Sequence, residues 1–251
     1  MNATHASLMT HLVAGYPREG ADEEVARALV RGGASFLELQ FPYSDPTADG
    51  PAIQEACQVA LDAGFRVRYG FDLVRRIAEA TQVPIFIMSY AGLVFARGVE
   101  TFVQEASAAG ARALIVPDLP LDSDEGLLSA ARDAGIAIVP VTVATASLER
   151  LEALRPYNPE YLYVALRAGT TGSETRLSRE SVRFLDAARE VAGHVMGGFG
   201  ISRREQVEAL LPHCHSAVVG SAIVRAIKAA EPHSAATAAE ALVRHLAWGE
   251  A

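Results

Sequence analysis

Eight short apolar runs, spaced along the whole chain, constrain the fold more than any other feature of the sequence. They lie at residues 8–14, 36–39, 84–88, 113–116, 136–139, 161–166, 194–196 and 217–219. Strands that are apolar on both faces are typical of a parallel sheet covered by helices. Because helical segments separate the runs, the pattern predicts an α/β protein with a closed (β/α)8 or TIM barrel. An open doubly wound sheet is the alternative.

Helical segments connect these runs, and glycines follow several of them. Residues 24–30 carry apolar side chains at the spacing of one helix face. Gly33, Gly110 and Gly135 each lie just before a predicted strand, where a glycine readily ends a helix. The chain therefore alternates between strand and helix from end to end.

The connection between the second and third runs is the longest. It is predicted to hold an extra helix at about residues 51–63 before a regular helix at residues 71–80. A further amphipathic helix, which would close the barrel floor or wall, is predicted at residues 235–248. Since no linker or charge run divides the sequence, residues 1–251 are predicted to form one barrel domain with extra helices.

Charge and hydropathy restrict the classes of partner. The net charge of −8 argues against binding nucleic acid, which requires clustered Lys and Arg. No apolar run reaches the roughly 18 residues that a membrane span needs, and the N-terminus does not resemble a secretory signal. We therefore expect a cytoplasmic protein, in which Cys57 and Cys214 are free thiols.

The passage FLELQFPYSDPTADGP, at residues 36–51, concentrates the candidates for chemistry. Glu38 lies inside an apolar strand, where a carboxylate must find a partner or shift its pKa, and a tuned acid of this kind serves proton transfer. A buried Lys or Arg partner is the structural alternative. Asp45 and Asp49 follow in the loop, where each, taken singly, also suits a turn or the start of a helix.

Two glycine clusters follow the seventh and eighth runs. Residues 197–202, GGFGIS, and residues 218–224, VVGSAIV, each lead into a predicted helix. Backbone N–H groups at such helix starts bind anions, and the loops after strands seven and eight are the usual phosphate site of this barrel class. The small-residue loop at residues 169–173 suits either a lid over the site or a plain connection.

Other candidates for chemistry are weaker. His213-Cys214-His215 has no second ligand pair at a zinc spacing, so no metal site is predicted. No lysine lies near a predicted strand end, which argues against Schiff-base chemistry. His11, in the first strand, suits a hydrogen-bonded core residue better than a catalytic one.

Six motifs carry a family resemblance. FLELQFPYSDPTADGPAIQEA, SYAGLVFARG, IVPDLP, YVALRAGTTG, GGFGIS and VVGSAIV, in this order and spacing, closely resemble the α subunit of tryptophan synthase. The resemblance covers residues 8–227. It implies a lyase of tryptophan biosynthesis that cleaves indole-3-glycerol phosphate to indole and glyceraldehyde 3-phosphate by a retro-aldol reaction, with no metal or organic cofactor.

The resemblance also implies roles for individual residues. Glu38 matches the catalytic acid/base, and Asp49 matches the carboxylate that holds the indole N–H. Tyr163 matches a tyrosine hydrogen-bonded near that aspartate, and Thr171 matches a lid threonine that orders it. The implied substrate-binding residues are Tyr90, Tyr163, Thr171, Gly172, Phe199, Gly200, Gly220 and Ser221, with the phosphate on Gly172, Gly200, Gly220 and Ser221.

The resemblance implies a partner as well. The partner is a tryptophan synthase β subunit, which carries pyridoxal phosphate, in an αββα heterotetramer. Pro42, Ser44 and Asp45 match its docking loop, and docking would order both the Asp49 loop and the lid at residues 169–173.

Several positions depart from the family pattern. Gln40 stands in place of Gly, Tyr16 in place of Asp, and Gly92 in place of Asn. Pro-Val-Thr-Val at residues 140–143 replaces Ala-Pro-Thr-Thr, and His11 replaces a Phe of the indole pocket. Both carboxylates are intact, so these changes bear on the pocket shape and on coupling to the β subunit.

Three other functions compete with this lyase. One is an isomerase or epimerase that acts on another phosphorylated molecule, although the loop SDPTADGP argues against it. The second is a free-standing lyase that releases indole. The third is a non-catalytic barrel that serves as an allosteric partner of a β chain, which intact Glu38 and Asp49 disfavour.

Overall fold

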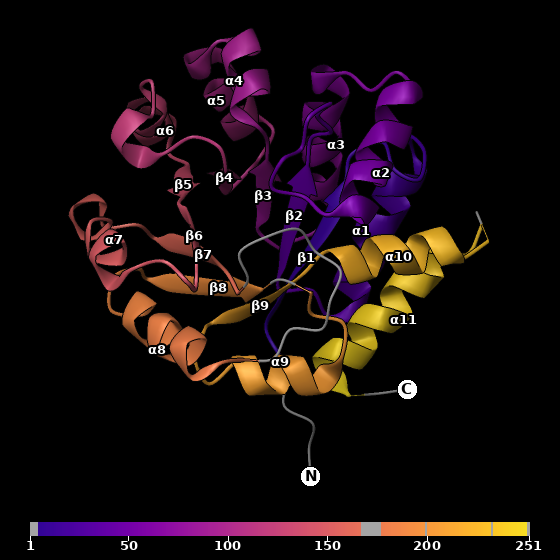
Figure 1. Ribbon diagram of the computed structural model, residues 1–251. Helices are drawn as coiled ribbons and strands as arrows, with labels where there is room; N and C mark the ends of the chain where they lie inside the picture. The colour runs from indigo at the N-terminus through magenta and orange to yellow at the C-terminus, as the bar shows by residue number, and fades with distance from the viewer. Residues whose placement is uncertain (1–4, 167–176, 199, 232, 250–251) are drawn as a thin grey trace.

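A parallel sheet at the centre of the molecule is surrounded by helices (Figure 1). The computed structural model describes residues 5–166, 177–198, 200–231 and 233–249. Its strands are β1 (Leu8–Val13), β2 (Phe36–Gln40), β3 (Ile85–Met88), β4 (Ala113–Ile115), β5 (Ala137–Val139), β6 (Val141–Val143), β7 (Tyr161–Ala165), β8 (His194–Gly198) and β9 (Ser216–Val219). These nine segments coincide with the eight predicted runs, because the fifth run is continued by β6.

The order of the strands closes the sheet into a barrel. It runs β5-β4-β3-β2-β1-β9-β8-β7-β6, and every pair is parallel. β5 and β6 are separated only by Pro140, which has no N–H to donate to a neighbouring strand. Its carbonyl still accepts the N–H of Tyr163 at 2.9 Å. The two end segments are thus one interrupted strand, and the predicted eight-stranded barrel is confirmed over the open sheet.

The helices form the outer layer. They are α1 (Ala21–Gly32), α2 (Pro51–Asp62), α3 (Val67–Ala80), α4 (Ala91–Arg97), α5 (Val99–Ala108), α6 (Leu127–Ala134), α7 (Leu148–Glu152), α8 (Arg179–Ala188), α9 (Arg204–Leu210), α10 (Ser221–Ala229) and α11 (Ala235–Trp248), with 3-10 turns at Leu121–Ser123 and Arg155–Tyr157. The predicted extra helix is α2. The regular helix that follows, α3, begins four residues earlier than predicted. The C-terminal helix α11 packs on α1 and α10 and so belongs to the barrel wall.

Two apolar layers lie on either side of the sheet. The larger one joins the outward side chains of the strands to the helices, and the smaller one, with Met9, Phe86 and Met196, fills the barrel interior. Since successive strand residues point to opposite faces, Glu38 and Gln40 share the inward face of β2 with Phe36. The barrel interior is therefore apolar, with polar groups at the carboxyl ends of the strands.

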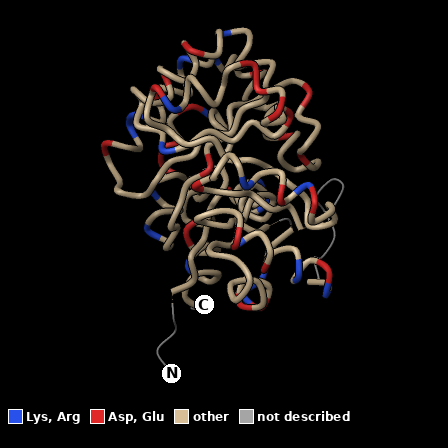
Figure 2. Tube along the Cα trace, turned by 90° about the vertical axis from the view of Figure 1, so that its left-hand side faces the viewer, with Lys and Arg blue, Asp and Glu red and all other residues tan. Residues whose placement is uncertain are grey.

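Charged side chains lie mainly on the outer helices, where both signs are interspersed (Figure 2). Many form ion pairs within or between helices, such as Arg76 with Glu23 and Lys228 with Glu55. No helix in the described part of the chain is long and apolar enough to cross a membrane.

Candidate active site

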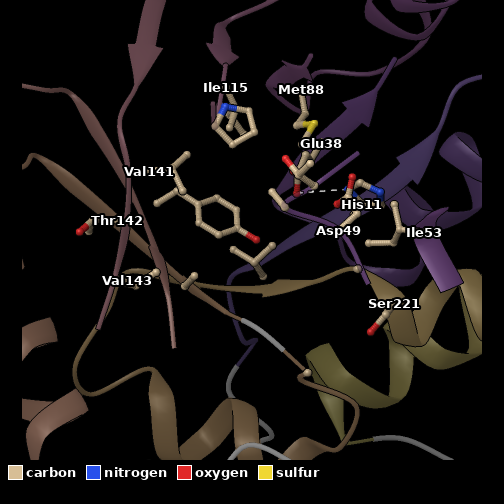
Figure 3. A pocket seen from close by; sticks show the side chains of 18 residues that line it. His11, Glu38, Asp49, Ile53, Met88, Ile115, Val141, Thr142, Val143 and Ser221 are labelled. Atoms are coloured by element: carbon tan, nitrogen blue, oxygen red, sulfur yellow. Dashed lines mark ion pairs between the residues drawn. The ribbon is translucent and has the colours of Figure 1, made fainter. Parts of the chain in front are cut away.

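A cavity of about 370 Å³ opens at the carboxyl ends of the strands. Its polar lining includes Glu38, Asp49, His11 and Tyr163, and much of the rest of its wall is apolar. Figure 3 shows Glu38, His11 and Asp49 grouped on one wall, with Val141 across the cavity from them. Strand β2 and the loop that follows it thus bring both predicted catalytic carboxylates into one pocket.

Glu38 has a partner in His11. The two residues are opposite one another in the parallel register of β1 and β2, so both side chains project into the barrel. His11 Nδ1 lies 3.5 Å from Glu38 Oε2, and both side chains are almost fully buried (Figure 3). The partner is thus neither the Lys nor the Arg that the structural alternative required.

His11 is the basic side chain on this wall of the cavity. Burial by itself lowers the pKa of His11, but the negative charges of Glu38 and Asp49 outweigh burial and raise it above its usual value. Among the described residues that line the cavity, His11 has the only basic side chain. His11 was predicted to be a hydrogen-bonded core residue, whereas the structure places it beside the candidate acid/base.

Asp49 is buried, and one of its two carboxylate oxygens accepts two hydrogen bonds from side chains. Its Oδ2 accepts hydrogen bonds from Gln40 Nε2 at 2.7 Å and from the Tyr90 hydroxyl at 2.8 Å. Its Oδ1 has no hydrogen-bond partner within the described part of the chain. Burial raises the pKa of Asp49, while His11 and the two donors oppose that shift. One oxygen is fixed by the protein, and the other is left for a ligand.

The two predicted tyrosines lie in different surroundings. Tyr90 is 1% exposed, donates to Asp49 and accepts the Ala48 N–H at 3.0 Å, so it supports the Asp49 loop rather than lining the cavity. Tyr163 does line the cavity, and burial together with the charges of Glu38 and Asp49 raises its pKa well above the usual value. The tyrosine that is hydrogen-bonded to Asp49 is therefore Tyr90.

The predicted phosphate residues that are described lie together at one end of the cavity. Gly200, which has φ of 74°, follows β8, and Gly220 and Ser221 form the start of α10. N–H groups in the first turn of a helix lack partners within the helix, so they are available to an anion. Thr171, Gly172 and Phe199, together with the loop at residues 169–173, lie outside the described residues, and their roles stay predictions.

The predicted docking loop is partly exposed. Ser44 and Asp45 are exposed and hydrogen-bonded to each other, with Ser44 Oγ 2.7 Å from Asp45 Oδ2. Pro42 is buried, so it shapes the loop without presenting a surface. Of the three predicted interface residues, Ser44 and Asp45 are accessible to a partner.

Sequence reasoning missed part of the apolar wall. Val141, Thr142 and Val143 of β6 line the cavity, as do Ile53 and Ile115. The departure from the family pattern at residues 140–143 was the available signal. In the cysteine-histidine cluster, His213 pairs with Asp186, and no group of three metal-ligating side chains occurs among the residues described.

Fold and cavity together define a barrel protein with a candidate acid–base site. Its two buried carboxylates face one apolar cavity, and a helix start suited to anions lies at the end of that cavity. The sequence matches the family model described as "Tryptophan synthase alpha chain" over residues 1–249.

Curated relatives and solved structures agree with this match. The Helicobacter hepaticus tryptophan synthase alpha chain is 37% identical over 88% of this chain and 85% of its own length. The Synechocystis alpha chain is 36% identical over 96% and 92%. A Mycobacterium tuberculosis tryptophan synthase structure has a TM-score of 0.88 at 30% identity, covering 96% of this chain and 91% of the other. The chain belongs to the tryptophan synthase alpha chain family, and the prediction of a lyase of this family is confirmed.

Proposed function

We propose that this chain cleaves indole-3-glycerol phosphate to indole and glyceraldehyde 3-phosphate in tryptophan biosynthesis. One observation carries the proposal: Glu38 and Asp49, both buried, face a single apolar cavity that is large enough for a bicyclic aromatic ring. The apolar wall suits the indole, and the start of α10 suits the phosphate.

Glu38 is the acid/base in this mechanism. Breaking the bond between indole C3 and the side chain requires a proton on C3 and removal of a proton from the neighbouring hydroxyl group. A single carboxyl group performs both steps when it donates its proton to C3 and then accepts the proton of the hydroxyl. The adjacent His11, with Nδ1 3.5 Å from Glu38 Oε2, holds the carboxyl group in place on this wall of the cavity.

Asp49 stabilises the indole ring while C3 is protonated. Protonation of C3 places positive charge on the ring nitrogen, and a fixed anion near that nitrogen lowers the barrier. The free Oδ1 of Asp49 is the atom that accepts the indole N–H in this arrangement, because Oδ2 is already bonded to Gln40 and Tyr90. The protein thus holds the anion in place before the charge develops.

The phosphate group binds at the start of α10. We assign the phosphate to backbone N–H groups near Gly200, Gly220 and Ser221. Gly172 is the fourth phosphate contact that the resemblance predicts. All of the proposed chemistry is performed by side chains and backbone groups of this chain, without a metal or an organic cofactor.

A tryptophan synthase β chain is the proposed partner, in an αββα heterotetramer. One structure similar to this chain is described as the tryptophan synthase complex of Pyrococcus furiosus, with a TM-score of 0.86 at 30% identity and coverage of 97% of this chain and 98% of the other. The exposed Ser44 and Asp45 are the proposed contacts, and pyridoxal phosphate belongs to the partner. As a biosynthetic enzyme, the protein is proposed to work in the cytoplasm.

The deciding experiment measures indole formation from indole-3-glycerol phosphate by the purified chain, with and without its β chain. We expect indole in both cases, with a higher rate when the β chain is present. Absence of indole under both conditions would contradict the proposed lyase activity. Activity that the β chain leaves unchanged would instead favour a free-standing lyase that releases indole.

A further inference from the structure

Gln40 makes an unusual contact for the last residue of a barrel strand. Its side chain is fully buried on the inner face of β2, and its amide Nε2 donates to Asp49 Oδ2 at 2.7 Å. The orientation of the amide is determined by this contact, because the reverse orientation would set its oxygen against a carboxylate. The amide oxygen, Oε1, is then buried with no hydrogen-bond partner among the described residues.

That unpaired oxygen is informative. A buried amide oxygen that loses its water and gains no partner is destabilising. An apolar side chain or a glycine at position 40 would avoid this cost. The free-energy cost of the unpaired oxygen must be offset by the contacts of the amide nitrogen. Among the described residues, the nitrogen contacts Asp49 and the Cys57 sulfur, the latter at 3.4 Å.

A second departure from the family pattern supports the same carboxylate. The Tyr43 ring stacks on Tyr90 with 5.3 Å between ring centres, and the Tyr90 hydroxyl donates to Asp49 Oδ2. A side chain at position 92 would collide with Tyr43, because a Cβ built on Gly92 would lie 2.5 Å from the Tyr43 hydroxyl. Gly92 thus leaves room for Tyr43 against Tyr90, and the two departures, Gln40 and Gly92, converge on Asp49.

We propose that Gln40 is the positioning residue of Asp49, and that it fixes the carboxylate in its working orientation within the single chain. The donated bond holds Oδ2 of Asp49, a residue that lines the cavity, and leaves Oδ1 to the ligand. Placement of Asp49 therefore does not wait for a partner to order its loop, and any activation by a β chain acts elsewhere in the site. The inference rests on the proposed lyase activity.

Three variants of Gln40 separate its donor from its shape. Gln40→Met keeps the length of the side chain and removes the donor, and Gln40→Gly introduces the residue that is usual in the family. Gln40→Glu replaces the donor with an acceptor that titrates. Gln58→Met is the matched control, because Gln58 is an exposed residue of α2 bonded to Asp62.

The isolated Gln40→Met chain is expected to lose about 10- to 100-fold in kcat for indole formation, the effect of one hydrogen bond to a buried charged group. KM should change by less than about threefold, because Asp49 acts mainly on charge that develops in the transition state. Gln40→Gly should lose at least as much. Binding of glycerol 3-phosphate, measured by calorimetry, should stay unchanged in every variant, since the phosphate end of the cavity is intact.

The pH dependence of kcat in Gln40→Glu distinguishes a donated hydrogen bond from a purely structural role of Gln40. Two neighbouring carboxylates repel each other when both are ionised, and one of them retains a proton at lower pH. A protonated Glu at position 40 donates to Asp49 again. The kcat of Gln40→Glu relative to the unchanged chain should therefore rise as the pH falls from about 8 to about 5, while the relative kcat of Gln40→Met stays flat.

The outcomes distinguish this inference from the lyase assignment. If the unchanged chain forms no indole, with or without a β chain, the proposed function fails and takes this inference with it. If the unchanged chain is active and Gln40→Met matches it in kcat, the lyase stands and the positioning role is wrong. A flat relative pH profile for Gln40→Glu would likewise overturn the role of the donated hydrogen bond.

Discussion

Replacing Glu38 by Gln isolates the proton-transfer step from the shape of the site. The amide has nearly the same volume as the carboxyl group, so the packing of the buried side chain on the inner face of β2 is retained. It cannot carry the proton between the hydroxyl and C3. Asp49, the other carboxylate among the described residues that line the cavity, has Oδ2 occupied by two donors, and its Oδ1 is assigned to the indole N–H.

The expected loss follows from this absence of a substitute. Removal of a general acid/base costs about 10²- to 10⁴-fold in rate, which corresponds to about 3 to 5 kcal/mol of transition-state stabilisation. The variant also removes the negative charge that faces His11 at 3.5 Å. Because that charge raises the pKa of His11, the pKa should fall in the variant.

Indole formation under saturating substrate measures kcat, and NMR titration of the ring protons follows His11. Glu55→Gln is the matched control, because Glu55 is an exposed glutamate of α2 paired with Lys228. We expect Glu55→Gln to keep full activity. If Glu38→Gln retained more than about half of the activity of the unchanged chain, the acid/base role of Glu38 would be refuted.

Two further perturbations test the phosphate end and the barrel floor. Ser221→Asp places a negative charge at the start of α10, which favours the helix but repels a phosphate. In calorimetry, glycerol 3-phosphate should bind this variant at least about 10-fold more weakly than the unchanged chain. The melting temperature of the variant should stay unchanged. Burial and the neighbouring His215 lower the pKa of His194 to about 4. The stability that depends on neutral His194 is therefore complete above pH 6.5 and is lost as the pH falls toward 4. In urea unfolding, the free energy of unfolding of the unchanged chain should fall by about 1 to 3 kcal/mol more than that of His194→Phe between those pH values. Equal losses would contradict the lowered pKa of His194.

The barrel was predictable because its signals are local. Each strand is an apolar run, and Gly33, Gly110 and Gly135, which were predicted to end helices, adopt positive φ angles that suit a helix end. The interruption at Pro140 was not predictable from periodicity. The run ends at the proline, and only the pairing of Val141–Val143 with β7 shows that the strand resumes.

The carboxylates of the site were predictable for a different reason. A glutamate between Leu37 and Leu39 is conspicuous in any strand, and the loop that contains Asp49 is a specific motif. Their partners were not predictable, because a partner is a matter of register and loop path. His11 faces Glu38 only through the pairing of β1 with β2.

The direction of the Gln40 side chain was predictable from the sequence, but its hydrogen-bond partner was not. Alternation along β2 from Phe36 places Glu38 and Gln40 on the same inward face, so the direction of the Gln40 side chain follows from the sequence. Its contact with Asp49 does not, since residues 41–48 between them form a loop whose path depends on Tyr90 and on the room left at Gly92. A polar residue at the carboxyl end of a barrel strand is therefore predicted to serve the site, but which group it serves emerges only from the fold.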